Sequence, residues 1–535
     1  MKRFLKWFSL LTALSVLLFS FSAFAEENMD TSPSSAPMGA PPSEEPAGTP
    51  PDGMTPPDGM APPDGMPGDP PAGAPGDDPP DGMTPPDGMT PPDGGPGDPP
   101  DGASGGTPPG GFGGGPGGPG GPGGPSGPGG SSADIDYAAV MEITSASTET
   151  DLVVSSSAAD ENALLVSTDG EVTLENLTVT KSGDSAGGDS CSFYGLNAAV
   201  LAMGGSTVSI KGGSIESSAS GANGVFSYGG NGGRNGTEGD GTAVYISDTV
   251  ITTTGDGSGG IMTTGGGVTC AENLTVTTSG RSSAAIRTDR GGGTVTVTGG
   301  TYTTNGLGSP SIYCTADITV SDTELVSNLS EGICIEGKNS VTLNNCDLTA
   351  ANTACNGNAT FLDTVMIYQS MSGDADSGTS SFTMTGGSLT GLSGHLFHVT
   401  NTNAVISLTD VAISNVDDIL LSVCDDGWNG AGNTAVLNTS SQTLSGLILV
   451  GDNSVLDLRL SDSSSFEGSI SGSIVNAKGD TVSTDVGEVN VVLDETSVWT
   501  LTADTYVTSF SGSAENVVSN GYTLYVAGVA LEGTR

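Results

Sequence analysis

The sequence predicts an all-β solenoid over residues 134–535, and two observations support this prediction. Thr, Ser, Val, Ile, Gly and Asn dominate this part of the chain, whereas helix-forming residues are few. A pattern of apolar-x-apolar-x-x-x-x-apolar also recurs through it, with a base period of 23 to 26 residues. A repeat of this length is typical of stacked turns, because one turn cannot bury its apolar face alone.

The repeated pattern appears nine times, and its copy at 269 is the weakest. The copies are VTLENLTV (172), VSIKGGSI (208), VYISDTVI (244), TCAENLTV (269), VTVTGGTY (295), ITVSDTEL (318), VTLNNCDL (341), FTMTGGSL (382) and ISLTDVAI (406). Alternating apolar residues predict strands with one buried face. The pair at positions five and six, often GG, DT or DV, predicts a corner between two short strands.

A second apolar segment precedes six of the copies, so each turn is expected to contain about three short strands. These segments are AAVLAMG, NGVFSYG, GGIMTTG, AAIRTDR, PSIYCTA and EGICIEG. If equivalent positions stack from turn to turn, one interior column should contain Val208, Val244, Val295, Ile318 and Val341.

Two different segments precede the solenoid. Residues 1–25 combine Lys2, Arg3 and Lys6 with a short apolar run and a small-x-small site at Ala23 and Ala25, which predicts a cleaved signal peptide. Residues 26–133 are rich in Pro, Gly and Asp and contain five intact copies of PPDGM. They predict a disordered acidic spacer. We expect no transmembrane segment after the signal peptide has been removed.

The charge excludes one class of partner. The leader carries +3, residues 26–131 carry sixteen acids and no base, and the remainder carries 45 acids against 10 bases, which sums to −48. Such a chain repels phosphate backbones, so we expect no nucleic-acid partner. The seven cysteines include no C-x-x-C pair, and we expect them to be small buried fillers more than a disulfide framework.

The rungs resemble those of right-handed parallel β-helix proteins of the pectate-lyase-like superfamily, especially the adhesin-like and autotransporter-passenger branch. The resemblance covers about residues 134–535, and ETSVWTLTADTYVTSF with NGYTLYVAG resembles the closing rungs of passengers. It implies a right-handed parallel β-helix, with Trp499 at an apolar position. The chain departs from passengers in its Pro/Gly spacer and in the absence of a following barrel pattern.

The most basic cluster is IRTDRGGG, where Arg287, Asp289 and Arg290 precede a strand. Arginine presents a planar donor fork, so the cluster is a candidate binding site for a sugar carboxylate. The alternative is a corner in which Asp289 offsets its neighbours. Tyr313 and Trp428 are candidate stacking residues for sugars, with core or corner packing as the alternative.

Two acidic loops suit calcium, which takes oxygen ligands in flexible geometry. Their candidate ligands are Asp374, Asp376, Asp417, Asp418, Asp425 and Asp426. The alternative is that these loops are solvated corners, so calcium is possible and no cofactor is certain. The two histidines, His395 and His398, resemble a polygalacturonase arrangement only weakly, because the aspartate pairs follow them. The alternative for His398 is packing near the apolar face.

These observations predict a secreted bacterial surface protein that acts as a non-catalytic adhesin or binding module. Its expected partners are extracellular polysaccharide or the surface of a host or neighbouring cell. A calcium-dependent binder of acidic polysaccharide is the first alternative, and a polysaccharide lyase or hydrolase is the second. No catalytic residue is assigned, because the chain is poor in residues suited to catalysis; fold alone does not prove function.

Overall fold

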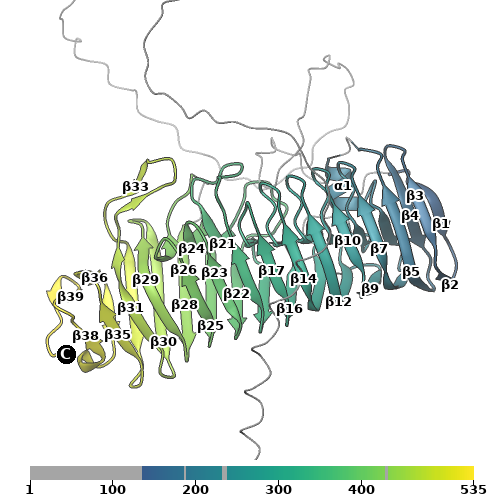
Figure 1. Cartoon of the computed structure of the whole chain (residues 1–535). Helices are drawn as coiled ribbons and strands as arrows, with labels where there is room; N and C mark the ends of the chain where they lie inside the picture. The colour runs from purple at the N-terminus through teal and green to yellow at the C-terminus, as the bar shows by residue number, and fades with distance from the viewer. Residues whose placement is uncertain (1–134, 186–187, 232–237, 428–431) are drawn as a thin grey trace, which may run out of the picture. The chain divides into compact units, whose positions relative to one another are not determined.

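The computed structural model describes residues 135–185, 188–231, 238–427 and 432–535, and this part of the chain is a parallel β-helix. Its rungs stack in sequence order from β1 to β38, as Figure 1 shows. The predicted signal peptide and spacer lie outside the described residues. No helix of the described part is long and apolar enough to cross a membrane.

One wall of the β-helix is a fifteen-stranded sheet, which we call sheet A. Its strands are β1 (Ala138–Ile143), β4 (Glu161–Ser167), β6 (Val200–Met203), β8 (Val225–Tyr228), β11 (Ile261–Thr264), β13 (Ile286–Thr288), β15 (Ile312–Cys314), β18 (Ile333–Glu336), β21 (Asp363–Tyr368), β24 (His395–Thr400), β27 (Ile419–Val423), β29 (Thr443–Val450), β31 (Ser465–Ser471), β35 (Val498–Leu501) and β38 (Val517–Val518).

The remaining walls form a twenty-stranded sheet, sheet B, which bends at a corner. Its strands are β2 (Ser147–Thr150), β3 (Val153–Ser156), β5 (Glu171–Lys181), β7 (Thr207–Ser217), β9 (Ala243–Ser247), β10 (Val250–Thr253), β12 (Gly267–Thr278), β14 (Gly293–Thr304), β16 (Asp317–Ser321), β17 (Glu324–Ser327), β19 (Ser340–Asn344), β20 (Asp347–Ala350), β22 (Thr379–Thr385), β23 (Ser388–Gly391), β25 (Asn403–Thr409), β26 (Ala412–Asn415), β28 (Asn433–Ser440), β30 (Ser454–Ser461), β34 (Glu488–Leu493) and β37 (Ser509–Ser511).

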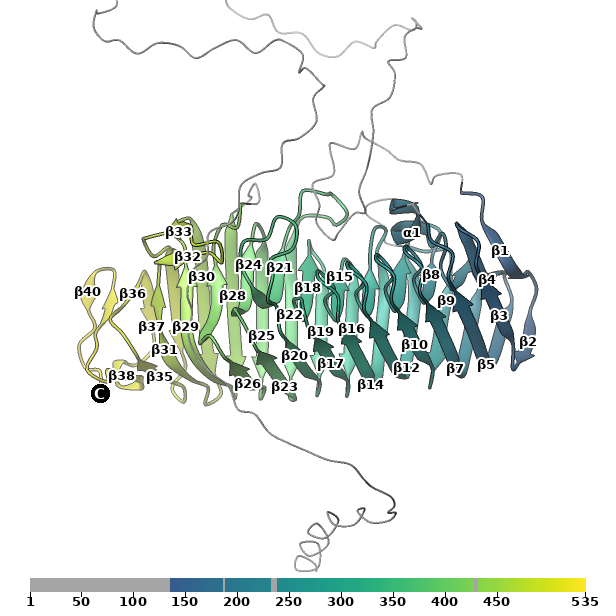
Figure 2. The ribbon, with the colours of Figure 1, turned by 45° about the horizontal axis from the view of Figure 1, so that its top comes forward.

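The smaller elements lie beside these walls or near the C-terminus (Figure 2). They are α1 (Asp189–Tyr194), the 3₁₀ turn η1 (Ala514–Asn516), the hairpin β32 (Ile474–Val475) and β33 (Thr481–Ser483), and the small sheet of β36 (Thr505–Val507), β39 (Leu524–Val526) and β40 (Val529–Ala530).

A middle turn shows the predicted three strands. The chain passes from β15 in sheet A to β16 and β17 in sheet B, and then returns to sheet A as β18. In β5, β7, β12 and β14 one continuous strand runs through the corner instead, and each pairs with strands on both sides of it. After β26 the second part of sheet B ends, and the next turns consist of two longer strands each, β28 with β29 and β30 with β31.

The predicted interior column is present. Val208 pairs with Val244 on the next turn, and the column continues through Val295, Ile318 and Val341, all of which are at most 1% exposed. Thr269 stands between Val244 and Val295, in the weakest copy of the repeat. Its buried hydroxyl lies 2.6 Å from that of Thr263, so a hydrogen bond satisfies the polar group inside the core.

Position five of the repeat is left-handed in all nine copies, with φ between 51° and 68°. The residues there are Asn176, Gly212, Asp248, Asn273, Gly299, Asp322, Asn345, Gly386 and Asp410. Only Gly, Asn and Asp occur, because other L-residues adopt this conformation at a cost. The corner predicted from the sequence is therefore a backbone requirement, repeated on every turn.

Side chains at the corner also bond from turn to turn. Asn345 Nδ2 donates to Asp322 Oδ1 at 2.7 Å, and Asn176 Nδ2 donates to Asp151 Oδ1 at 3.1 Å. Asp151 is itself left-handed, with φ 55°. A further corner therefore lies at Asp151, on the turn before the first copy that the sequence pattern identified.

Trp499 was expected at an apolar position and the cysteines were expected to be buried. Trp499 is fully buried on β35, stacks on Phe466 with 5.7 Å between ring centroids, and donates from Nε1 to the carbonyl of Gly468. No disulfide joins the cysteines, all seven of which lie in the described part of the chain. Five are buried, and Cys270 and Cys355 are partly buried, so the expectation of buried fillers holds for the five.

Substitutions at Asn345 separate the two roles of the corner. Asn345→Val places a β-branched side chain at positive φ and removes the bond to Asp322, and we expect it to lower the free energy of unfolding by about 2 kcal/mol. Asn345→Gly keeps the conformation and loses only the bond, so we expect a cost of about 1 kcal/mol or less. Urea unfolding of the full chain measures both.

The matched control is Asn344→Val, at the adjacent exposed position of β19. This strand position accepts a β-branched residue, and the variant loses only the bond from Asn344 Nδ2 to Ser321 Oγ at 3.3 Å, so we expect a cost of about 1 kcal/mol or less, as for Asn345→Gly. Equal destabilisation by valine at 344 and 345 would contradict a conformational requirement at position five.

Candidate functional site

Both faces of sheet A are buried over much of its length. Every residue of β8, β11, β13, β15 and β18 is buried, although alternate side chains of these strands point away from the core. Three elements outside the sheet supply covering side chains. The covering side chains are Phe193 of α1, Phe361 of the segment before β21, and Ile474 of the hairpin β32–β33.

One in-register row of outward side chains on sheet A changes in chemistry along the sheet. The row runs through Met262, Arg287, Tyr313, Cys334, Met366, His398 and Ser422. Its first polar side chain is on β13, and Cys334 and Met366 separate the polar residues before them from those after them. The polar residues of the row include several that the sequence singled out.

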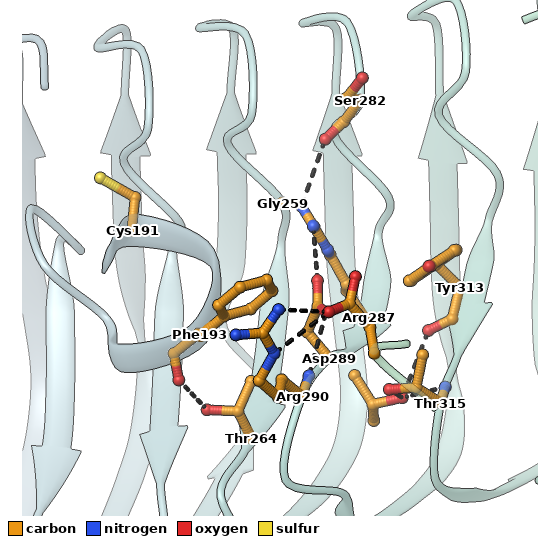
Figure 3. A network of polar contacts seen from close by, with 12 residues as sticks. Cys191, Phe193, Gly259, Thr264, Ser282, Arg287, Asp289, Arg290, Tyr313 and Thr315 are labelled. Atoms are coloured by element: carbon orange, nitrogen blue, oxygen red, sulfur yellow. Dashed lines mark hydrogen bonds and ion pairs between the residues drawn. The ribbon is translucent and has the colours of Figure 1, made fainter. Parts of the chain in front are cut away.

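Asp289 joins the two predicted arginines. Arg287 Nη2 donates to Asp289 Oδ2 at 2.7 Å, and the backbone N–H of Arg290 donates to Asp289 Oδ1 at 3.0 Å (Figure 3). Arg287 and Asp289 are 9% and 3% exposed. The guanidinium carbon of Arg287 also lies 5.7 Å from the ring centroid of Tyr313, within cation–π range.

Arg290 links α1 to a loop 84 residues further along the chain. Its Nη2 and Nε donate to Asp374 Oδ1 at 2.5 and 3.1 Å. Its guanidinium carbon lies 4.1 Å from the ring centroid of Phe193, and Figure 3 shows the two side chains face to face. The carbonyl of Phe193 accepts a bond from Thr264 Oγ1, which holds α1 against β11.

A buried carboxylate, Glu336, gathers hydroxyl groups beside this cluster. Tyr313 and Tyr368 donate to Glu336 Oε2 at 2.7 and 3.2 Å. Ser370 and Ser372 both donate to Glu336 Oε1, the latter at 3.2 Å. Glu336 is 1% exposed, so these four donors replace its hydration shell.

The polar contacts close into a ring, which we call the Arg–Asp–Glu ring. It runs through Arg287, Tyr313, Glu336, Ser372, Asp374, Arg290 and Asp289, and the N–H of Asp374 completes it by donating to Ser372 Oγ at 3.1 Å. Both arginines bond to carboxylates inside the ring. The cluster therefore brings Arg287, Asp289, Arg290, Tyr313 and Asp374 together, with their charges directed at one another.

Burial sets the ionisation of the ring. It raises the pKa of Asp289 to about 6, and the attraction of Arg287 offsets this only in part. Burial also raises the pKa of Glu336, although its hydroxyl donors lower it. The pKa of Tyr313 lies well above its ordinary value, chiefly through burial and then through the charge of Glu336, so its hydroxyl remains a donor.

The other predicted calcium ligands are distributed among separate contacts. Asp376 pairs with Lys338 at 2.6 Å, Asp417 accepts the N–H of Gly394, and Asp425 accepts the N–H of Gly427. Asp418 occupies a left-handed corner with φ 56°. Among the residues that the structure describes, no three His, Cys, Asp or Glu side chains converge on a point that could hold a metal. Trp428 lies outside the described residues.

Asp426 belongs to a second buried cluster, with both histidines. It accepts the N–H of Thr360 at 2.8 Å, and its Oδ2 lies 3.7 Å from His398 Nε2. His398 is fully buried, stacks on Phe361 with centroids 4.5 Å apart, and shares Ser422 with His395. Burial lowers the pKa of His395 to about 3, so this ring is neutral at ordinary pH. His398 therefore packs under a cover on the outer face of sheet A.

Sheet B presents an open face of different chemistry. Fifteen outward side chains on β14, β16, β19, β22 and β25 stand in three in-register rows, and all are exposed or half-buried. The rows are Thr294, Asp317, Ser340, Ser381 and Val405; Thr296, Thr319, Thr342, Thr383 and Ser407; and Thr298, Ser321, Asn344, Thr385 and Thr409. We call these fifteen residues the hydroxyl patch, since twelve are Thr or Ser.

Two sets of residues were missed from the sequence, for different reasons. The hydroxyl patch could have been found by aligning the copies, because position two of the repeat is Thr in five and Ser in two of the nine. The buried acids Glu331, Glu336 and Asp363 left no such signal. Each stands alone beside an apolar segment, and the neighbours that make it notable come from other turns.

Comparisons with protein-family models, with curated proteins and with solved structures found no match for this chain.

The raised pKa of Asp289 predicts a pH dependence of stability. The folded state binds its proton more tightly than the unfolded chain, so this contribution is complete below pH 3.8 and is lost as pH rises through about 6. Across that interval Asp289 should lower the free energy of unfolding by about 3 kcal/mol. Denaturant unfolding of the full chain between pH 4 and 7 measures the slope.

Asp289→Asn removes the titration and should flatten the profile by that amount. Near pH 4 Asp289 is itself protonated and neutral, so the stabilities of the variant and the wild type should differ least there. Asp376→Asn, at a partly exposed pair, is the control and should keep the wild-type slope. Parallel profiles for wild type and Asp289→Asn would show that Asp289 titrates in its ordinary range.

Proposed function

We propose that the protein is a secreted or surface-displayed, non-catalytic binding module of the adhesin type, and that its ligand-binding surface is the hydroxyl patch. The observation that carries this proposal is the contrast between the two walls. The charged groups of the Arg–Asp–Glu ring are buried or half-buried and are bonded within the ring, whereas the face of sheet B offers twelve hydroxyl side chains at the surface. The likeness of the rungs to adhesin-like passengers of the pectate-lyase-like superfamily supports the same proposal.

The composition of the patch points to a neutral polymer. Only Asp317 among its fifteen residues is charged, although the chain as a whole carries −48. A surface without Lys or Arg gives no attraction for uronate or phosphate groups. Threonine and serine hydroxyls both donate and accept hydrogen bonds, and sugar hydroxyls do the same.

The geometry of the patch suits an extended repeating ligand. Strands of a sheet lie about 4.8 Å apart, so each row repeats its hydroxyl at that spacing over five turns. Many weak and equivalent contacts then add along one polymer chain. An extracellular neutral polysaccharide, free or on a cell surface, is therefore the proposed partner.

Binding of the full chain to polysaccharides tests the proposal. We expect retention on neutral polymers such as cellulose, xylan, mannan or chitin, weaker retention on polygalacturonate or alginate, and no release of reducing ends or unsaturated products. Product release would refute the non-catalytic function. Retention only on uronates with calcium would favour the calcium-dependent alternative, and retention on none of the polymers would refute a polysaccharide ligand.

A triple substitution locates the binding surface. Thr296→Val, Thr319→Val and Thr342→Val together remove three hydroxyls of the central row and keep the β-branched shape. At about 1 kcal/mol per lost hydrogen bond, retention should weaken roughly a hundredfold. Thr252→Val, Thr277→Val and Thr303→Val form the matched control on the other side of the corner, where three in-register threonines lie outside the patch. Equal effects of the two triples would exclude the patch as the binding surface.

A further inference from the structure

Lys181, the last residue of β5, is a fully buried lysine within a column of buried hydroxyl residues. Each member of this column pairs in register with the member on the next turn, so their side chains occupy equivalent places. We call it the Ser/Thr column. Its members are Ser156, Lys181, Ser217, Thr253, Thr278, Thr304 and Ser327.

Other members of the Ser/Thr column satisfy backbone carbonyls with a hydroxyl group. Thr253 Oγ1 donates to the carbonyl of Ser258, and Thr278 Oγ1 donates to the carbonyl of Ser283. A hydroxyl is neutral, so burying it costs less free energy than burying an ammonium group. Threonine therefore suffices for carbonyl capping on these turns, and the amine of Lys181 is the feature that needs a separate explanation.

The amine of Lys181 meets the side-chain amide of Asn197 at one carbonyl oxygen. Lys181 Nζ donates to the carbonyls of Ala158 and Gly183 at 2.8 and 2.5 Å. Asn197 Nδ2 donates to the same carbonyl of Gly183 at 3.0 Å. Asn197 is also fully buried and adopts a left-handed conformation, with φ 68°. Because one oxygen accepts from both groups, the amine and the amide lie close together inside the molecule.

The side-chain amide of Asn197 is bonded through its nitrogen alone. Besides its bond to Gly183, Nδ2 donates to the carbonyl of Ser220 at 3.3 Å. Oδ1 is buried without a hydrogen-bond partner in the described part of the chain, which is rare for a buried amide oxygen. The carbonyl oxygen is thus left open to a proton donor, which would draw electron density from Cγ and favour attack on it.

Two contacts bring a carboxyl group to this pair, that of Glu161 at the start of β4. Ser156, the in-register neighbour of Lys181, donates from Oγ to Glu161 Oε2 at 2.8 Å. Asn162, the next residue along the chain, donates from Nδ2 to backbone carbonyls on both sides of Asn197, at 2.9 and 3.1 Å. The beginning of β4 therefore lies against both the lysine and the asparagine.

The buried environment favours the reactive form of the amine. Burial lowers the pKa of Lys181 from its ordinary value, and the charges of Glu161, Asp184 and Asp160 offset this effect only in part. A lower pKa increases the fraction of neutral amine, which is the nucleophilic form. Held beside an amide by the fold, such an amine reacts at an effective concentration that a free amine cannot reach.

We propose that Lys181 and Asn197 form an intramolecular isopeptide bond, and that Glu161 carries the proton in this reaction. Neutral Nζ attacks Cγ of Asn197, the bond between Nζ and Cγ forms, and the bond between Cγ and Nδ2 breaks. Glu161 takes a proton from Nζ and passes a proton to the leaving nitrogen, which departs as ammonia. The reaction needs no oxidant, reductant or further reactant.

The bond would close residues 182–196, which include α1, into a covalent loop. Closing a loop of this kind restricts the unfolded chain and so stabilises the fold. It would also fasten the base of the insertion that places Phe193 over sheet A. The proposal therefore assigns a covalent modification to the first turns of the β-helix.

The mass of one proteolytic fragment of the full chain tests the bond. Glu175 and Glu216 are consecutive glutamates, so cleavage after glutamate releases fragment 176–216, which contains both partners. We expect this fragment to be lighter than its sequence by one ammonia. Trypsin, which requires a free lysine side chain, should leave it uncut at Lys181. A wild-type fragment with the mass of its sequence would overturn the proposal, whatever the variants show.

Three variants identify the groups that react. Lys181→Met keeps the length of the side chain without the amine, and Glu161→Gln keeps the shape but cannot carry the proton, so both should restore the full mass. Lys211→Met, at an exposed lysine of the same fragment, is the control and should keep the loss. Full loss of ammonia in Lys181→Met would indicate a succinimide at an asparagine, and full loss in Glu161→Gln would show that no proton carrier is needed there. Either result would overturn the proposal.

These masses are independent of polysaccharide retention by the hydroxyl patch. Failure of either proposal therefore leaves the other standing.

Discussion

In-register parallel pairing places equivalent positions of successive turns directly above one another, and every other feature of the structure depends on this constraint. A residue that suits one turn must also suit the turns on either side of it. The interior column of Val208, Val244 and Val295 follows, because a charged residue there would lie between two apolar neighbours. The corner follows too, since a left-handed residue on one turn requires left-handed residues next to it.

The outer face of sheet A is where the same constraint produces variety. Its row changes from Met262 to Arg287, Tyr313 and His398, whereas the rows of the hydroxyl patch on sheet B consist mostly of Thr and Ser. Elements between the rungs cover this face of sheet A, and each supplies a side chain that suits the residue beneath it. Phe193 covers Arg290, and Phe361 covers His398. Regular rungs supply the scaffold, and irregular insertions supply the local polar clusters.

The regular part of the fold could be predicted from the sequence, because its apolar pattern and its corner residue recur on each turn. The period, the three strands per turn and the corner at positions five and six all follow from nine copies compared with one another. The Arg–Asp–Glu ring could not be predicted, since Arg290 and Asp374 are 84 residues apart and lie in non-repeated segments. Arg287 and Asp289 were identified because they are close in sequence, yet the sequence left open whether they face a ligand or each other.

The same distinction separates the buried acids from the acidic loops. Asp374 and Asp376 were conspicuous as neighbours in sequence, but each bonds to a basic residue. Asp363 stands alone in sequence, and its environment comes from Glu331 on an earlier turn and Asp426 on a later one. Sequence spacing identifies ligands that lie on one loop, whereas a site assembled across turns requires the register between them.

The basic residues of this strongly acidic chain make most of their contacts inside the molecule. Ten Lys and Arg residues follow the leader, and six of them donate side-chain hydrogen bonds within the described chain, including Arg281, which donates to Asn356 Oδ1 at 3.1 Å. Lys181 donates to two backbone carbonyls, and Arg287, Arg290, Lys338 and Arg459 pair with aspartates. The positive charges of these residues therefore interact with groups of the same chain. The rest of the surface is acidic and repels polyanions. The hydroxyl patch has one aspartate among its fifteen residues, so the neutral polymer that we propose as its ligand would meet little charge there, and its selectivity would follow from the polyanions that the surface excludes.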